Sequence, residues 1–390
     1  MEQRLAVQKP CLPARRENGG GIARFLLSTA AVFLLIYAGQ FLSAKILAKV
    51  FLYRVRDRQF RSWDEMLAAF QRFVESDLCL LGSLFLTAVT IALCLLYCRV
   101  IEKKTPAGIG LSLHGMPAET AKGLLAGFGM LSAAVLLAFL SGSLVFGGFC
   151  SPSPAALLLF LAAFLVQGTS EEVLLRGFYL QTSIGRVPPA AAVIANAAVF
   201  AALHLRNPGI GPLAFFNLML VGVFFSLLTL GSGSLWGAAA AHGMWNFAQG
   251  NFYGILVSGL SVRTTALSFQ PQGGMDLISG GAFGLEGGAA ASAVLLAAIA
   301  LAGGGNKKRG GRVALLGGKK EKNRKRAGPK EKIFSPPSFL IWRLLPSAPR
   351  VGADGFSLPL PPVFDPAAGR GPLVDGVPSA VVRDAQREDH

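Results

Sequence analysis

Charged residues are scarce in this sequence. Only 15% of its 390 residues are Asp, Glu, Lys or Arg, whereas a soluble protein of this length has about 25%. Hydrophobic residues make up 52% of the chain, and several apolar runs approach the roughly 20 residues that a helix needs to cross a bilayer. The composition therefore argues against a soluble protein and indicates a helical protein with several membrane spans.

Cysteine and histidine are also few, with five and four residues. No cysteine pairs with a histidine at the spacing of a metal site, and Cys94 and Cys98, one helical turn apart, are interpreted as packing residues. We therefore expect no disulfide framework. The sequence has no H-E-x-x-H zinc motif, and no G-x-S-x-G turn surrounds Ser170 to make it a nucleophile.

The apolar runs predict an all-α transmembrane bundle of about eight spans. The first run is longer than the apolar core of a signal peptide and is interpreted as an uncleaved span. The predicted spans are residues 25–42, 78–98, 123–142, 155–181, 190–205, 213–230, 235–249 and 289–302. Residues 45–77 mix charged and aromatic residues, and their second half predicts an amphipathic helix in the membrane interface. Gly123 and Gly127, one turn apart, predict close contact with another helix.

The ends of the chain differ in composition from its middle. We expect a flexible basic lead over residues 1–24, N-terminal spans over 25–150, a second membrane domain over 151–303 and a disordered, basic, Pro- and Gly-rich tail over 304–390. Twelve Lys or Arg and two Glu lie between Lys307 and Lys332. Such a run beside a membrane attracts anionic lipid and marks the cytoplasmic side, so we expect both termini in the cytoplasm and no nucleic-acid partner.

Two carboxylates and a guanidinium follow the uncharged run 155–166: Glu171, Glu172 and Arg176. Ionisable groups at membrane depth are costly and serve pairing, transport or chemistry. Glu172 and Arg176 are four residues apart with the acid first, which predicts an ion pair on one helix face. Glu171 points about 100° away from Glu172 on a helix, which leaves it free to act as a base. A purely structural ion network between helices fits the same residues.

Two of the four histidines lie inside predicted spans. His204 shares a helix face with Phe200, and His242 shares one with Asn246, because each pair is four residues apart. If the spans converge, these residues would supply a base, a proton partner and oxyanion donors. A lone histidine inside a membrane is more often only a hydrogen-bonding residue between helices.

Three sequence blocks, in this order on separate spans, resemble the CPBP family of intramembrane proteases: Glu171-Glu172-x-x-x-Arg176, Phe200-x-x-x-His204 and His242-x-x-x-Asn246. That family includes the type II CAAX prenyl endopeptidases and bacterial bacteriocin-immunity (Abi) proteins. The resemblance covers Ala155 to about Gln249, and the loop that ends near Glu286 is also similar to bacterial members. It implies that Glu172, Arg176 and Phe200 support the site.

The resemblance implies a catalytic role for four residues. Glu171 would activate a water with the assistance of His204, while His242 and Asn246 would bind the oxyanion of the tetrahedral intermediate. No cofactor is required by this mechanism. Members of the family are often labelled metalloproteases, and Glu171, His204 and His242 could also bind zinc with one open position. The sequence leaves metal dependence open.

The resulting hypothesis is an intramembrane endopeptidase of the bacterial plasma membrane. Its substrate would be a peptide or a membrane protein, with or without a prenyl group. Two other classes fit the same composition. One is an ion- or proton-coupled transporter, although we find no internal repeat of the kind that transporters carry. The other is a non-catalytic membrane immunity or scaffold protein.

Overall fold

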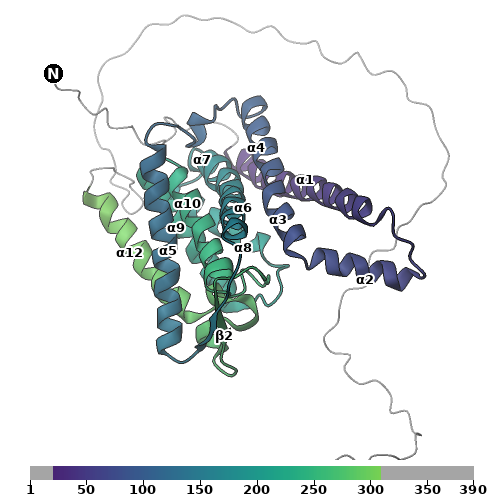
Figure 1. Cartoon of the computed structure of the whole chain (residues 1–390). Helices are drawn as coiled ribbons and strands as arrows, with labels where there is room; N and C mark the ends of the chain where they lie inside the picture. Colours follow the sequence, from purple (N-terminus) through teal and green to yellow (C-terminus); the bar gives the residue numbers. More distant parts are fainter. Residues whose placement is uncertain (1–20, 309–390) are drawn as a thin grey trace, which may run out of the picture. The chain divides into compact units, whose positions relative to one another are not determined.

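The computed structural model describes residues 21–308, with the side chains of residues 304–308 excepted. The predicted tail beyond residue 308, its binding of anionic lipid and residues 1–20 of the predicted lead lie outside this range. Residues 21–24, which we assigned to the flexible lead, already form the start of a helix. The described residues are mostly helical (Figure 1).

The described residues form twelve α-helices and two strands. The helices are α1 (Gly21–Val55), α2 (Trp63–Val74), α3 (Asp77–Leu86), α4 (Ala88–Val100), α5 (Met116–Leu140), α6 (Pro154–Glu172), α7 (Gln181–Ile184), α8 (Pro189–Leu203), α9 (Pro212–Ser232), α10 (Trp236–Phe247), α11 (Asp276–Ser279) and α12 (Ala289–Lys308). The strands are β1 (Leu144–Phe149) and β2 (Leu267–Pro271). Two π-helical segments, Val173–Leu180 and Ala248–Phe252, continue α6 and α10. Three short 3₁₀ turns complete the structure: Ala107–Ile109, Gly281–Phe283 and Leu285–Gly287. Proline stands in the first turn of α5, α6, α8 and α9, where its missing N–H leaves no hydrogen bond unmade.

Five of the helical segments are long and apolar enough to cross a membrane. They are Gly21–Val55, Asp77–Val100, Met116–Leu140, Pro154–Ile184 and Pro212–Ser232. The other three predicted spans are helical but shorter, in α8, α10 and α12. Length and composition therefore support five of the eight predicted spans.

The prediction of an all-α fold was wrong in one respect. Strands β1 and β2 form a two-stranded antiparallel sheet, from Leu144 opposite Pro271 to Phe149 opposite Leu267. A cross-strand aromatic pair adds to the backbone pairing, since the ring centroids of Phe146 and Phe269 lie 5.3 Å apart. A strand of six residues beside a 25-residue apolar helix is hard to recognise from hydropathy alone.

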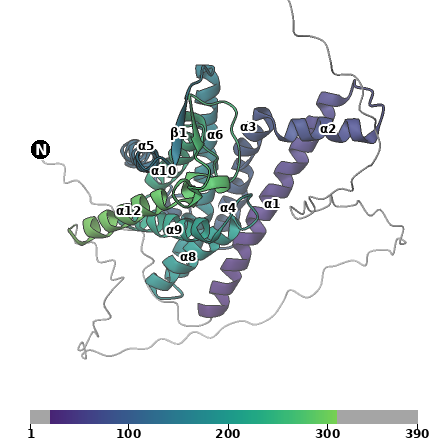
Figure 2. The same ribbon diagram turned by 90° about the horizontal axis from the view of Figure 1, so that it is seen from below.

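The charged segment after the first span is mostly helix. Helix α1 runs past the predicted end of the span to Val55, and α2 forms the predicted amphipathic helix. Phe70 and Phe73 of α2 pack on Phe51 of α1, with ring centroids 5.2 and 5.5 Å apart. Figure 2 shows α2 lying beside the end of α1. Trp63 at the start of α2 is 72% exposed, and the position of this helix in the membrane interface stays a prediction.

Glycine contacts bring α5 and α6 against α10. A Cβ atom on Gly123 or Gly127 of α5 would collide with the backbone of α10, which confirms the predicted close contact. A Cβ atom on Gly168 of α6 would lie 2.7 Å from the amide nitrogen of Gly243 in α10. Only glycine permits backbones to approach so closely. The second contact sets the distance between the carboxylates of α6 and the histidine of α10.

Candidate active site

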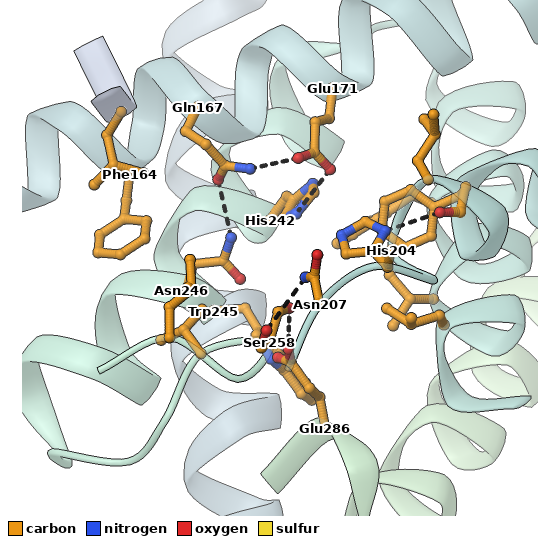
Figure 3. A pocket seen from close by; sticks show the side chains of 18 of the residues that line it. Phe164, Gln167, Glu171, His204, Asn207, His242, Trp245, Asn246, Ser258 and Glu286 are labelled. Atoms are coloured by element: carbon orange, nitrogen blue, oxygen red, sulfur yellow. Dashed lines mark hydrogen bonds and ion pairs between the residues drawn. The ribbon is translucent and has the colours of Figure 1, made fainter. Parts of the chain in front are cut away.

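All four residues predicted to be catalytic line one cavity of about 230 Å³. Its polar lining is shown in Figure 3 and includes Gln167, Glu171, His204, Asn207, His242, Asn246, Ser258 and Glu286. The remaining lining is largely aliphatic or aromatic, with Ile36 from α1 and Leu80 and Leu84 from α3 on one wall. The helices that carry the three sequence blocks therefore converge, as the hypothesis of a site requires.

Glu172 is the centre of a buried ion cluster. Its Oε1 accepts a hydrogen bond from Nη1 of Arg176 at 2.8 Å and lies 2.9 Å from Nδ1 of His242. The side chains of Glu172 and Arg176 are both 0% exposed. The ion pair predicted from the spacing is present, and the same carboxylate oxygen also orients the imidazole of His242.

Arg176 is enclosed by aromatic rings. Its guanidinium lies 4.8 Å from the ring centroid of Phe200 and 5.5 Å from that of Phe225, and Nη2 donates to the carbonyl of Gly222 at 3.3 Å. Cation–π contact and the Glu172 carboxylate together compensate for the loss of water around the guanidinium. Phe200 thus contacts the site through Arg176 and through the ring of His242, 6.0 Å away.

Glu171 is the carboxylate that faces the cavity. Its side chain is 20% exposed, and Oε1 accepts a hydrogen bond from Nε2 of Gln167 at 2.6 Å. Oε2 has no hydrogen-bond partner among the described residues and lies 3.8 Å from Nε2 of His242. One oxygen of Glu171 is therefore held in place and the other can accept a proton.

Both histidines are held through their Nδ1 atoms. Nδ1 of His204 lies 2.8 Å from the carbonyl oxygen of Phe200, and because a carbonyl only accepts, Nδ1 carries the proton and Nε2 is the free nitrogen. Nδ1 of His242 likewise faces an acceptor, Glu172, so its Nε2 faces Glu171. The histidine nearest to Glu171 is thus His242, whereas the resemblance had paired Glu171 with His204.

The side-chain amide of Asn246 already makes a hydrogen bond inside the cavity. Its Nδ2 donates to Oε1 of Gln167 at 3.0 Å, and Gln167 in turn donates to Glu171 (Figure 3). A hydrogen-bonded chain therefore links Asn246 of α10 to the carboxylate of α6. This bond uses one of the two N–H groups of the Asn246 amide, so the other can donate to an oxyanion.

Two of the helices that carry the site, α6 and α10, continue as π-helix, and Arg176 lies in the first π segment. Val173 follows Glu172 directly and begins an eight-residue π segment, and Ala248 begins another two residues after Asn246. Segments of this kind are rare, cost backbone hydrogen-bond geometry and are frequent at functional sites. Their position here marks the same region that the three sequence blocks select.

Five polar lining residues were not predicted from the sequence: Gln40, Gln167, Asn207, Ser258 and Glu286. Gln167 could have been found, because it precedes Glu171 by one helical turn. Asn207 follows α8 and donates to the carbonyl of Ser258 at 3.2 Å. Ser258 donates through its hydroxyl to Glu286. The last three lie on loops, where spacing carries no information about contact.

The residues considered as zinc ligands do not form a metal site. Among residues 21–308, no three His, Cys, Asp or Glu side chains come together in a way that could hold a metal ion. The zinc alternative considered for Glu171, His204 and His242 therefore finds no support in the arrangement of these side chains.

Comparison with known proteins selects the same region. Residues 153–248 match the family model of the type II CAAX prenyl endopeptidases, described as Rce1-like. No curated protein and no solved structure matches the chain. The matched segment runs from the residue before α6 to the first residue after α10, and so contains Glu171, His204 and Asn246 but not Ser258 or Glu286.

Proposed function

Because residues 153–248 form an Rce1-like type II CAAX prenyl endopeptidase domain, we propose that this protein is an intramembrane endopeptidase that uses a glutamate-activated water. The observation that carries the proposal is the difference between two adjacent carboxylates. Glu172 is fully buried, paired with Arg176 and absent from the cavity lining, whereas Glu171 is 20% exposed and lines the cavity. A purely structural ion pair with Arg176 would need Glu172 but not Glu171.

Hydrolysis begins with attack of a water oxygen on the carbonyl carbon of the scissile peptide bond. Glu171 takes the proton of this water through its free oxygen, and Nε2 of His204 is the second proton acceptor in the cavity. A positioned base of this kind contributes roughly 10²–10⁴-fold. The proton then passes to the leaving nitrogen as the C–N bond breaks, so that the products are a carboxylic acid and an amine.

The negative charge of the intermediate needs hydrogen-bond donors. Nε2 of His242 donates when the imidazole carries both protons, and Glu171 and Glu172 both attract a positive charge on this ring. Asn246 supplies the second donor through the N–H of Nδ2 that does not bind Gln167. One such donor contributes roughly 10²–10³-fold.

The setting of this site is a lipid bilayer, with a peptide segment of a membrane protein, prenylated or not, as substrate. We propose that the shorter helices α8, α10 and α12 complete eight crossings. Gly21 lies beside Arg186, where a Cβ atom would be 3.3 Å from its carbonyl, and α12 runs along α9 from Ser292 onward. Both ends of the described chain then lie on the side that carries Lys104 and Arg186, which the positive-inside rule assigns to the cytoplasm.

The experiment that tests this function compares wild type with Glu171→Gln, which keeps the shape of the side chain and removes the base. Mass spectrometry of membrane peptides from cells with either protein should show cleavage products only with wild type. Glu75→Gln, at an exposed residue outside the cavity, is the matched control and should cleave like wild type. Cleavage of the same peptides by Glu171→Gln would contradict the proposal.

Wild type and its variants also distinguish a protease from the two other functional classes, a transporter and a non-catalytic protein. A transporter would give ion or proton flux in proteoliposomes and no cleavage products. A non-catalytic immunity or scaffold protein would keep its cellular phenotype after replacement of Glu171, His204 or His242. Purified wild type in lipid, incubated with prenylated and unprenylated forms of one peptide, shows whether the prenyl group is recognised.

A further inference from the structure

A second carboxyl group lies in the cavity, opposite Glu171. It belongs to Glu286, which is only 5% exposed and comes from the loop between β2 and α12 (Figure 3). The proposed mechanism gives Glu286 no task, and the family match ends well before it. A buried carboxyl without a counter-ion is unfavourable, so its presence in a cavity indicates a function.

The loop around Glu286 is rigidly built. Asn217 of α9 donates through Nδ2 to the carbonyls of both Glu286 and Gly288 at 2.9 Å, and Ser292 donates to Oδ1 of the same asparagine at 2.7 Å. Gly284 has φ 97°, and a Cβ atom there would collide with the carbonyl of Leu256. The backbone therefore presents the Glu286 side chain at one fixed place.

A residue in a strained backbone conformation, Ser258, also holds the Glu286 side chain. Ser258, with φ 48°, is one of two described non-glycine residues in the left-handed region, and its hydroxyl donates to Oε1 of Glu286. Residues in this region are uncommon outside glycine and concentrate at functional sites. The turn is held from outside by Asn207, which donates to the Ser258 carbonyl.

The cavity contains negative charge and no fixed positive charge. Its lining includes two carboxyl groups, from Glu171 and Glu286, and no Lys or Arg among the described residues. The nearby Arg176 is fully buried behind Phe200 and committed to Glu172. No Lys, Arg or His nitrogen of the described chain forms an ion pair with Glu286, although His204 stabilises its negative charge. Burial raises the pKa of Glu286 above its ordinary value, as expected when the cavity holds no cation.

We propose that Glu286 recognises a positively charged side chain of the substrate, so that the protease cleaves peptides with Lys or Arg beside the scissile bond. This inference rests on the proposed function and names its substrate class. A cation is the group that a lone buried carboxylate binds best. A free C-terminal carboxylate, in contrast, would meet two like charges and no cation in this cavity.

The apolar part of the cavity lining can contact the aliphatic stem of such a side chain. Lys and Arg carry an aliphatic stem that packs on apolar surface while the charged head reaches a polar group. Val257 and Leu260 flank Ser258 in the lining, and Leu218 and Val221 of α9 line the cavity as well. A basic side chain can therefore bury its stem and still bring its charge to Glu286.

The test uses fluorogenic peptides in which each position in turn carries Arg or citrulline, its neutral isostere. With full-length wild type in lipid, we expect Arg at one position near the cleaved bond to raise kcat/KM by about tenfold or more over citrulline. In Glu286→Gln this ratio should fall to about one, while Glu286→Asp should retain part of it. Glu75→Gln should keep the wild-type ratio.

Binding separates this inference from the proposed function. In the Glu171→Gln background, which is expected not to cleave, the Arg peptide should bind about tenfold more tightly than the citrulline peptide, and the added Glu286→Gln change should abolish the difference. If wild type cleaves both peptides equally well and the Glu171→Gln variant binds them equally tightly, the inference is wrong, while the proposed function still stands. An unchanged Arg preference in Glu286→Gln would overturn the inference as well. Preferential binding without any cleavage would support recognition by Glu286 and contradict the protease.

Discussion

Nδ1 of His242 lies 2.9 Å from Oε1 of Glu172, the oxygen that also accepts from Nη1 of Arg176 at 2.8 Å. One carboxylate thus ties α10 to α6 and at the same time neutralises a buried guanidinium. This oxygen fixes the orientation of the His242 ring through Nδ1, so that Nε2 faces Glu171. Glu172 therefore contributes both to the stability of the fold and to the proposed catalysis, and variants can separate the two contributions.

Replacement of Glu172 by Gln should reduce both stability and activity. It leaves the Arg176 guanidinium buried without a carboxylate, and breaking a buried ion pair costs about 3–5 kcal/mol. The double variant Glu172→Met/Arg176→Met removes both charges and should regain much of the stability but no activity, because His242 loses its acceptor. Thermal unfolding in detergent and cleavage rates measure the two effects.

The control for this pair is the ion pair of Glu119 and Lys122 on the surface of α5, with the same 2.8 Å separation. Glu119→Gln should change stability by less than about 1 kcal/mol, since exposed pairs are screened by water. Wild-type cleavage by the double methionine variant would show that His242 does not depend on Glu172.

Replacement of His204 by Asn should remove catalysis while keeping the fold. The Asn amide can donate to the Phe200 carbonyl as Nδ1 does, but it has no counterpart of the free Nε2. We expect kcat to fall roughly 10²–10⁴-fold with little change in KM in steady-state cleavage assays. If kcat is retained, the proton partner of Glu171 is His242, which lies nearer to it.

Replacement of Gly168 by Ala should separate α6 from α10. The added Cβ would lie 2.7 Å from the backbone nitrogen of Gly243 and 3.1 Å from its Cα, so a helix has to move. Since His242 precedes Gly243, its distance from Glu171 would increase, and we expect at least about a tenfold loss of cleavage with membrane insertion unchanged.

The matched control is Gly129→Ala in α5. Gly129 is also helical but has no atom within 4 Å of its added Cβ. This change should be neutral or stabilise the protein by up to about 1 kcal/mol, as Ala for Gly does in a helix interior. Equal activity of the Gly168 and Gly129 variants would mean that the α6–α10 distance is not critical.

Contacts within one helix turn could be predicted from the sequence, and contacts between segments could not. The spacing of Glu172 and Arg176 predicts their ion pair, because four residues complete about one turn of a helix. That His242 rather than His204 approaches Glu171 depends on how α6 crosses α10. This crossing depends on the contact of Gly168 with Gly243, and no periodicity reveals which glycines meet.

The loop beyond α10 was the least predictable part of the site. Ser258 reaches Glu286 only because it adopts a left-handed conformation that a serine rarely takes. Glu286 itself stands in a glycine-rich segment whose sequence is typical of an irregular loop. Asn217 of a different helix holds that segment, and such long-range backbone contacts leave no pattern in a single sequence.

Replacement of Glu286 by Gln should make stability less dependent on pH. Burial raises the pKa of this carboxyl above its ordinary value of 4.5, and the groups that face it are His204 of α8 and, across the cavity, Glu171 of α6 and His242 of α10. The folded protein then binds one proton more than the unfolded chain between the two pKa values, so stability falls as pH rises through this interval.

The glutamine amide that replaces this carboxyl cannot ionise, so the loss of stability disappears in the variant. The thermal midpoint of Glu286→Gln relative to wild type should therefore increase as the pH is raised from about 4 to about 8. Glu75→Gln, at a residue 67% exposed, should show no such trend. A constant difference between wild type and Glu286→Gln over this range would mean that Glu286 keeps the same charge in the folded and unfolded states.

The proposed eight crossings predict which residues share a side of the membrane. Leu235, at the start of α10, donates its amide to the carbonyl of Gly110 before α5, and Trp236 donates to that of Ser112, both within 2.9 Å. The start of α8 packs with the end of α9 through Ala192, Val193 and Leu230. Cys150, in contrast, follows α5 and β1 and lies at the other end of α5.

Labelling with a membrane-impermeant maleimide tests this arrangement in a background without the other cysteines. In intact cells Cys150 should react, whereas His114→Cys, Ala191→Cys and Gly231→Cys, each placed at an exposed position in a variant that lacks Cys150, should react only after permeabilisation. Because α8 is too short by length alone to count as a span, Ala191 and Gly231 are the decisive pair. If they label from opposite sides, α9 crosses without α8, the two ends of the described chain lie on different sides, and the eight-span proposal is wrong.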